Sequence, residues 1–287
     1  MSYRYTPAGS SYPSPTEPKI PKLRILGSLS LTAKNGKSCS PRALKLRILL
    51  ANLLCGHNRA IPIEHLIREL WNESPPKTAK TALQVYVSNI RKVLDTTDLA
   101  PGYARIVTQP PGYMLEVDEN VLDLALFEQY WREARNAQDT GRTKMASQLL
   151  SDALALWRGP ALSDVCTTPD LQAEARRLNE MRQAARERKI LLDLELGRHT
   201  EVISELYALT SRHPFHENLC AYLMIALQRQ GRPADALDVY SELARALRNE
   251  LGLDPGTQLQ RLHQLILLRE PIPIDSTFEL LQLDKTA

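Results

Sequence analysis

The side chains best suited to chemistry in this sequence form one polar stripe between residues 77 and 92. On a helical wheel of about 100° per residue, one side of this segment carries Lys77, Thr81, Gln84, Ser88 and Lys92. Lys80 and Arg91 flank this side, Val85 lies near it, and no acidic residue occurs before Asp95. Gln and Lys hydrogen-bond base edges, Thr and Ser suit bases or phosphates, cations suit phosphates, and a valine methyl suits thymine. The stripe predicts a recognition helix for the DNA major groove; the alternative is a solvated amphipathic helix.

Three consecutive helices are expected to position this stripe. The third, from about Lys77 to Leu94, has an opposite, apolar face formed by Ala79, Ala82, Leu83, Tyr86, Val87, Ile90, Val93 and Leu94. The first is expected to have Ser40 as its N-cap, Pro41 at its first position and Gly56 at its end. The second begins at Pro62 and presents Ile63, Leu66, Ile67, Leu70 and Trp71 on one face.

Short β-segments flank these helices. Alternating residues over Lys22–Gly27 and Ser28–Lys34, followed by Asn35-Gly36, predict a small β start with a tight turn. Arg105–Thr108 and Tyr113–Val117 flank a Gln-Pro-Pro-Gly turn and predict a second hairpin. Strands, three helices and a hairpin follow one another in the order of a winged helix.

From Leu122 to about Arg269 the sequence is helical in pattern. A glycine and an arginine lead into a helix three times, at Gly141-Arg142, Gly197-Arg198 and Gly231-Arg232. The last two glycines are 34 residues apart, the tetratricopeptide period, whereas the first interval is 56. We therefore expect an irregular, all-α helical-repeat domain; an ordinary helical bundle is the alternative.

The net charge of +3 hides an uneven distribution. Residues 19–118 carry 15 Lys and Arg against 7 Asp and Glu, a balance of +8. Residues 119–287 carry 20 against 25, a balance of −5. This asymmetry favours polyanion binding by the N-terminal half and protein contacts by the C-terminal half.

Several motifs in this order resemble a known family. Residues 64–71 (EHLIRELW), 82–94 (ALQVYVSNIRKVL) and 110–115 (PPGYML) resemble the OmpR-type winged helix, the last of them its wing. With residues 153–160 (ALALWRGP) and 250–256 (ELGLDPG), the whole of 22–270 resembles the Streptomyces antibiotic regulatory protein (SARP) family. The resemblance implies a winged helix at 22–119 and a tetratricopeptide-like bacterial transcriptional activation domain at 120–270. Residues 1–21, rich in proline and serine, predict a disordered leader, and residues 271–287 form a tail beyond the resemblance. The expected fold class is mainly α with a small β component.

The resemblance also implies a function. Family members activate secondary-metabolite genes by binding direct repeats near the −35 promoter region, as side-by-side copies, and by recruiting RNA polymerase holoenzyme through its sigma subunit and its alpha C-terminal domain. The corresponding polymerase contacts here are Glu69, Asn72, Glu73 and Ser74. Besides the stripe and its flanking residues, the expected DNA contacts include Asn89, Arg105, Thr108 and Gln109. Gln109, Met114 and Asn89 stand where the family usually has arginine, which puts wing contacts and the bases read by the helix in question.

Other classes of function find little support in the sequence. It contains no GxxxxGK[ST], GxGxxG or GxSxG motif, so we expect no enzyme and no cofactor. No metal site is expected either, because the cluster His213-Pro214-Phe215-His216-Glu217 offers too few ligands and Cys39, Cys55, Cys166 and Cys220 form no CxxC pair. No segment is apolar enough to cross a membrane, which predicts a cytoplasmic protein with no membrane partner.

Two competing functions and one unexplained segment remain. The repeats could serve chiefly as a protein–protein adaptor with non-specific DNA tethering, or they could sense a pathway intermediate that gates activation. The tail beyond Pro271 and Pro273 carries Phe278, Leu280, Leu281 and Leu283. It either docks on the repeats or serves as a short contact segment, and the sequence does not choose between these roles.

Overall fold

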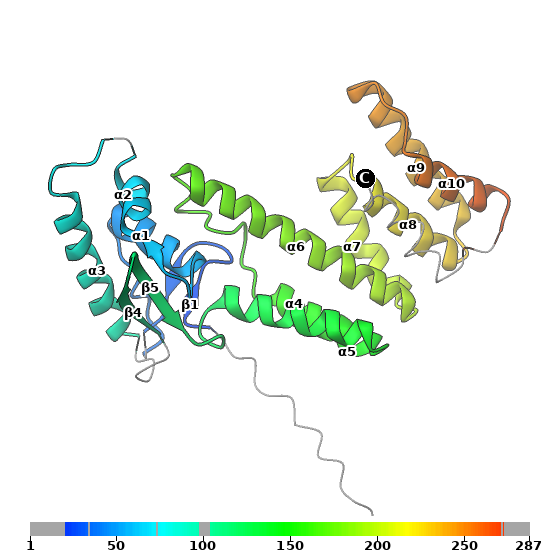
Figure 1. Cartoon of the computed structure of the whole chain (residues 1–287). Helices are drawn as coiled ribbons and strands as arrows, with labels where there is room; N and C mark the ends of the chain where they lie inside the picture. The colour runs from blue at the N-terminus through cyan, green and yellow to red at the C-terminus, as the bar shows by residue number, and fades with distance from the viewer. Residues whose placement is uncertain (1–20, 34, 73, 98–103, 271, 273–287) are drawn as a thin grey trace, which may run out of the picture. The chain divides into compact units, whose positions relative to one another are not determined.

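The computed structural model describes residues 21–33, 35–72, 74–97, 104–270 and 272. The chain forms two compact units: Met1–Leu126 with Gly159–Ala173 (unit 1), and Phe127–Arg158 with Glu174–Ala287 (unit 2) (Figure 1). Unit 1 contains β1 (Leu23–Arg24), β2 (Ser30–Leu31), α1 (Leu44–Cys55), β3 (Ile61–Pro62), α2 (Ile63–Trp71), α3 (Ala79–Asp95), β4 (Ala104–Gln109) and β5 (Gly112–Val117). The predicted leader and almost all of the predicted tail lie outside the described residues.

The N-terminal strands are shorter than the alternation of residues predicted. β1 and β2 pair antiparallel over two residues each. Beyond them, the buried Asp123 carboxylate accepts hydrogen bonds from the backbone N–H groups of Ile25 and Leu26, at 2.9–3.0 Å. Asp164 accepts the N–H of Leu29 at 2.9 Å. Side-chain carboxylates therefore take the place of a neighbouring strand here, and strand pairing ends early.

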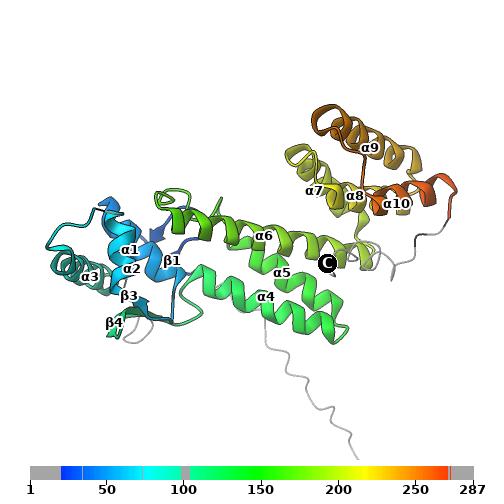
Figure 2. The ribbon, with the colours of Figure 1, turned by 45° about the horizontal axis from the view of Figure 1, so that its top comes forward.

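The three predicted helices of unit 1 are confirmed, with one wrong cap. α1 begins at Leu44, not next to Ser40, because the Ser40 hydroxyl accepts the N–H of Leu31 at 2.8 Å and holds this segment against β2. α1, α2 and α3 contact one another pairwise, and their apolar faces form the core of the unit (Figure 2). Gly36 has φ +76° in the turn after β2, at the predicted Asn35-Gly36 position.

A three-stranded antiparallel sheet of order β3-β5-β4 completes the winged helix. β4 and β5 form the predicted hairpin, whereas β3 has no signature in the sequence. Gly112 lies opposite Pro62 in the β3–β5 register. A Cβ atom on Gly112 would lie 1.8 Å from the Ile61 carbonyl oxygen, so only glycine allows β3 and β5 to approach this closely.

Unit 2 is built from helices. They are most of α4 (Asp123–Asp139), α5 (Thr143–Ala155), most of α6 (Pro169–Glu195), α7 (His199–Arg212), α8 (Glu217–Arg229), α9 (Pro233–Ala246), the π-helix η1 (Leu247–Leu251) and α10 (Thr257–Leu267). The three predicted glycine–arginine turns join α4 to α5, α6 to α7 and α8 to α9. Each glycine has a φ between +70° and +76°, and each arginine N–H bonds the carbonyl five residues earlier, at 2.8–3.0 Å. The same helix-ending motif is thus used three times. The 27-residue α6 and the connection between α5 and α6 together make the first interval longer than the second.

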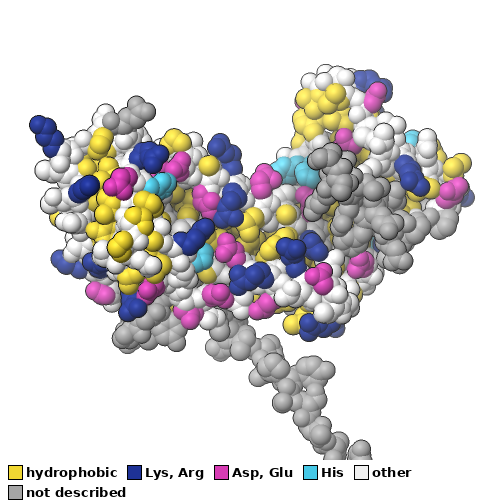
Figure 3. All heavy atoms as spheres, viewed as in Figure 1, with side chains coloured by type: hydrophobic (Ala, Val, Ile, Leu, Met, Phe, Trp, Pro, Cys, Tyr) yellow, Lys and Arg dark blue, Asp and Glu magenta, His cyan; other side chains and the backbone are white. Residues whose placement is uncertain are grey.

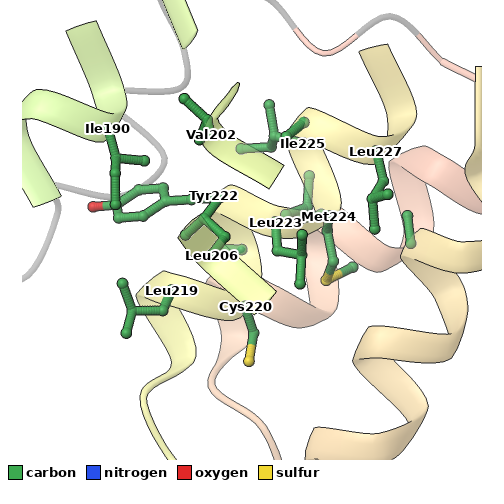
Figure 4. Packing of buried hydrophobic residues seen from close by; sticks show 14 of the residues in the cluster. Ile190, Val202, Leu206, Leu219, Cys220, Tyr222, Leu223, Met224, Ile225 and Leu227 are labelled. Carbon is green, nitrogen blue, oxygen red and sulfur yellow. The ribbon is translucent and has the colours of Figure 1, made fainter. Parts of the chain in front are cut away.

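A hydrophobic core of unit 2 lies among α6, α7, α8, α9 and α10 (Figure 4). α8 supplies its centre, since residues 219–227 are all buried. A helix buried on all sides needs helices on several faces, and α8 contacts α7, α9 and α10. The fold class predicted from the sequence, mainly α with a small β component, is confirmed. None of the described helices is long and apolar enough to cross a membrane.

Candidate nucleic-acid interface

α3 separates its two faces as the helical wheel predicted. Ala79, Leu83, Val87, Ile90 and Leu94 are buried. The polar stripe lies on the opposite side, where Lys77, Lys80, Thr81, Gln84, Ser88 and Lys92 are all exposed. Val85 is 52% exposed among them, a large share for an apolar side chain on a folded domain. The exposed face of α3 therefore combines hydrogen-bonding groups, cations and the exposed methyl groups of Val85.

The charge of this face is not neutralised by neighbouring carboxylates. Lys77, Lys80 and Lys92 form no ion pair with any described residue. Lysines without an acidic partner keep their full attraction for a polyanion. Arg105 differs, because its Nε lies 2.5 Å from Glu116 directly across the β4–β5 ladder.

Arg91 connects α3 to the hairpin instead of pointing freely to solvent. Its Nε donates to the Ile106 carbonyl at 3.0 Å, and its Nη2 lies 3.4 Å from the Thr108 hydroxyl. The side chain is half-buried, as is Asn89. Arg91 thus fixes the position of β4 relative to α3, a role that the helical wheel alone could not indicate.

An aromatic column supports α3 from behind. The Trp71 ring of α2 stacks on Tyr86 of α3, with centroids 6.0 Å apart and planes 17° apart. The Lys45 ammonium of α1 lies 4.6 Å from the centroid of the same Trp71 ring. Stacking and cation–π contacts add to the burial of apolar area, so all three helices are tied together where α2 ends.

The hairpin tip presents uncharged groups. Thr108, Gln109 and the two prolines after them are exposed, and Met114 is half-buried. No Lys or Arg therefore lies among these described tip residues. The tip can still offer an amide and a hydroxyl to a DNA backbone.

The residues expected to meet polymerase do not share one environment. Asn72 and Ser74 are exposed after α2, and Glu73 lies outside the described residues. Glu69 is not on the expected surface: it is 6% exposed, and its Oε2 accepts hydrogen bonds from Thr168 Oγ1 at 2.6 Å and Asn52 Nδ2 at 3.4 Å. We therefore assign Glu69 to the interior of unit 1 and leave it out of any partner surface.

An exposed polar helix on a winged helix-turn-helix, joined to helical repeats, defines a transcriptional regulator of the winged-helix class. Residues 41–115 match the family described as transcriptional regulatory protein, C terminal, and residues 122–267 match the bacterial transcriptional activator domain. The chain belongs to the Streptomyces antibiotic regulatory protein family.

Known regulators resemble the chain over most of its length. It is 38% identical to the regulatory protein DnrI of Streptomyces peucetius, over 87% of this chain and 93% of that protein. It is 36% identical to the transcriptional regulatory protein EmbR of Mycobacterium tuberculosis, over 86% of this chain but 63% of EmbR. A solved structure of M. tuberculosis EmbR with a low-affinity phosphopeptide superposes with a TM-score of 0.82 at 34% identity, covering 90% of this chain and 68% of that one.

Metal binding has no counterpart in the part of the chain that the structure describes. No group of three His, Cys, Asp or Glu residues there could hold an ion. His216, in the only histidine cluster of the sequence, instead pairs with Glu187 of α6, with Nε2 and Oε1 3.2 Å apart.

Proposed function

We propose that this regulator binds promoter DNA sequence-specifically through α3 and activates transcription from it. The observation that carries the proposal is the exposed stripe of α3, in which hydrogen-bonding side chains lie among three lysines that no described carboxylate neutralises. The proposed DNA contacts are Lys77, Lys80, Thr81, Gln84, Val85, Ser88, Asn89, Lys92, Thr108 and Gln109. Arg91 and Arg105 are reassigned to holding the hairpin in place, since both bond β4 or β5.

The proposed target is a pair of direct repeats near the −35 region, with side-by-side copies on one face of the DNA. Spacing by one helical turn places both copies on the same face. The uncharged hairpin tip supports cooperation between copies, because a single copy has few cations for phosphates. Tight, non-cooperative binding to one half-site would contradict this part of the proposal.

We further propose that the DNA-bound regulator recruits RNA polymerase holoenzyme through the segment after α2, where Asn72 and Ser74 are exposed. The similarity to DnrI supports a pathway-specific role in a secondary-metabolite gene cluster. Functionally, we assign DNA binding to residues 22–119, which places the protein at the nucleoid, and activation to residues 120–270.

Base-reading residues can be tested by substitutions on the stripe. Gln84→Ala and Thr81→Ala are each expected to weaken binding to the promoter by about 1–3 kcal/mol, the usual worth of a hydrogen bond to a base edge, while binding to random DNA changes little. Fluorescence anisotropy with both DNAs at several salt concentrations measures the two effects separately. Lys144→Ala, an exposed lysine on α5, serves as the control and should change neither.

The outcome that contradicts the proposal is equally specific. Equal affinity of the native protein for promoter and random DNA at physiological salt would instead favour a protein–protein adaptor tethered by charge. Footprints unchanged in Gln84→Ala and Thr81→Ala would show that another surface reads the bases.

A further inference from the structure

An open groove runs along the last helices of unit 2. It has a volume of about 570 Å³, and its lining includes Tyr240, Arg245, Arg248, Asn249, Gln260 and His263, from α9, η1 and α10. We call it the α9–α10 groove. Its volume falls in the range of about 300–1,000 Å³ typical of ligand pockets, but its open shape suits an extended chain better than an enclosed small molecule.

The lining of the α9–α10 groove combines a stacked pair of rings with two arginines and one carboxylate, Asp254. The Tyr240 and His263 rings stack with centroids 3.9 Å apart, and the buried Pro255 continues this surface. Arg245 and Arg248 are exposed at the end of α9 and on η1. Arg248 pairs with Asp254 at 2.7 Å, whereas Arg245 pairs with no described carboxylate. An occupant with both acidic and apolar side chains would match this lining.

Exposed apolar side chains border the groove. Leu251 and Leu253 are 51% and 57% exposed, at the end of η1 and just after it. Figure 3 shows hydrophobic side chains gathered over the end of α9 and η1, at the upper right of the view. Together with the stacked rings of the groove, these leucines extend the apolar surface available to an occupant.

The chain itself turns back toward the repeats after α10. Arg269 has φ +57°, and the Glu270 N–H bonds the Leu265 carbonyl at 3.0 Å, so a Schellman-type turn ends α10 here. Ile272 is half-buried and packs against the hydrophobic core of unit 2, against which Tyr240 also packs. Ile272, the last described residue, therefore lies against the same helices that carry the groove.

We propose that residues 273–287, the tail, occupy the α9–α10 groove of their own chain. The tail carries three acidic residues, Asp275, Glu279 and Asp284, against one cation, Lys285. It also carries Ile274, Phe278, Leu280, Leu281 and Leu283. Its net charge is opposite to that of Arg245, the groove arginine that pairs with no described carboxylate. Its apolar residues match the stacked rings and the bordering leucines.

The tail is long enough to reach. The 11 residues of α10 span about 16 Å at roughly 1.5 Å per residue, and about five or six extended residues cover that distance. A short tether also gives the tail an effective concentration in the millimolar range, so a modest affinity keeps it bound in preference to a second copy or another acidic peptide. The tail would then cover Leu251 and Leu253 in the resting protein.

The test measures whether an emptied groove accepts the tail as a free peptide. The protein is truncated after Ile272, and a fluorescein-labelled peptide of residues 273–287 is titrated into it. We expect the truncated protein to bind the peptide at least tenfold more tightly than the intact chain. Arg245→Glu with Arg248→Glu in the truncated protein should abolish binding, and a peptide with Asp275, Glu279 and Asp284 changed to lysine should restore it.

Matched variants keep the result interpretable. Arg176→Glu with Arg212→Glu, at exposed sites outside the groove, should leave peptide binding unchanged. If truncation lowers stability, the intact chain with Asp275, Glu279 and Asp284 changed to lysine replaces it and should accept the native peptide.

Three results would overturn the proposal. The first is that the peptide does not bind the truncated protein at concentrations up to about 1 mM, the effective concentration of a short tether. The second is that the peptide binds the variant with both groove arginines reversed as tightly as the truncated protein. The third is that the full-length protein is a dimer in light scattering and becomes a monomer on truncation. The last result would assign the tail to a second copy.

Discussion

Adjacent basic residues on α3 lie in different environments in this structure. Lys92 is exposed and without an ion-pair partner among the described residues, whereas Arg91 is half-buried and bonds Ile106 and Thr108 of β4. By charge alone, Lys92 and Arg91 would be equivalent candidates for phosphate contacts. Their hydrogen bonds separate Lys92, which we propose as a phosphate contact, from Arg91, which bonds the hairpin.

This difference predicts two distinct responses to salt. Lys92→Ala should weaken binding to all DNA sequences and make the slope of log K against log salt concentration shallower by about 0.9, because one fewer phosphate is neutralised. Arg91→Ala should leave that slope unchanged, weaken only specific binding, and speed amide hydrogen exchange in β4, because the hairpin is no longer bonded to α3. Anisotropy titrations between about 50 and 200 mM salt, the range over which such slopes are resolved, measure the first effect. A shallower slope in Arg91→Ala would return Arg91 to the set of phosphate contacts.

At the scale of elements, Gly112 decides whether β3 can join the sheet. Any β-carbon at this position meets the Ile61 carbonyl oxygen at 1.8 Å, and this oxygen is backbone that cannot rotate away. Gly112→Ala should therefore lower the free energy of unfolding by about 3 kcal/mol, at the upper end of overpacking costs. Gly159→Ala, where an added Cβ meets nothing within 4 Å, is the control. Urea unfolding of both variants tests this, and equal midpoints would contradict the close approach.

An ion pair between His216, at the start of α8, and Glu187 of α6 makes the stability of the fold depend on pH. The hydrogen bond to Glu187 raises the pKa of His216 against the opposing effect of burial, and Glu180 adds to the rise. Gln183 donates to the same Glu187 carboxylate. Burial, and then the Glu187 charge, raise the pKa of Tyr222 of α8. A base with a raised pKa stabilises the fold fully below its unfolded pKa of about 6.5, and this contribution is lost as pH rises through the folded value.

His216→Gln should therefore destabilise the protein near pH ~5.5–6, while its difference from the native protein shrinks by about pH 8, above the titration range of most histidines. Subtracting the two proteins cancels His199, whose pKa burial lowers and which has the opposite pH dependence. His213→Gln, an exposed neighbour, is the control. Thermal unfolding across this pH range tests the prediction. If the stability difference between His216→Gln and the native protein does not change with pH, the ion pair with Glu187 does not contribute to stability.

Elements with local signals were predictable from the sequence, and elements fixed by distant partners were not. The faces of α3 follow from helical spacing, and the turns at Gly197 and Gly231 follow from residue type. The early end of β1 and β2 depends on Asp123 and Asp164, which lie 97–135 residues from the amides they bond. No local pattern marks a carboxylate that replaces a strand.

The same reason explains why the environments of Glu69 and Arg91 were not predictable. Glu69 has an acidic side chain near a helix end, which suggests a surface residue. Its burial follows from Thr168, 99 residues away. Arg91 likewise has the spacing of a flanking cation, and its role in holding the hairpin depends on how the hairpin folds back.

At the scale of the whole molecule, the winged helix is completed by a segment from later in the chain. Gly159–Ala173 clusters with unit 1, although the matched activator domain spans 122–267. Leu162 and Ser163 donate backbone bonds to the carbonyls of Ile25 and Gly27, and Asp164 pairs with Arg47 of α1. The segment therefore contributes backbone and side-chain bonds that no residue before 127 supplies.

The hydrogen bond between Thr168 and Glu69 makes this dependence testable. Glu69 belongs to α2, the helix whose Trp71 supports α3, and Thr168→Val removes its shortest hydrogen-bond donor while leaving the carboxylate buried. We expect unit 1 to be destabilised by about 1–3 kcal/mol, the cost of an unsatisfied buried group. Hydrogen exchange of α2 amides measures this effect.

Thr167→Val changes the same side chain one residue earlier at an exposed position, where the hydroxyl reaches only the Val165 carbonyl at 3.5 Å. It should leave the exchange of α2 amides unaltered. If Thr168→Val also leaves the exchange of α2 amides at the native rate, residues 159–173 contact the rest of unit 1 without stabilising α2. If α2 opens faster in Thr168→Val alone, unit 1 depends on residues 159–173 for its stability. A helix that has lost a buried hydrogen bond opens more often, and when α2 opens, Trp71 no longer supports α3.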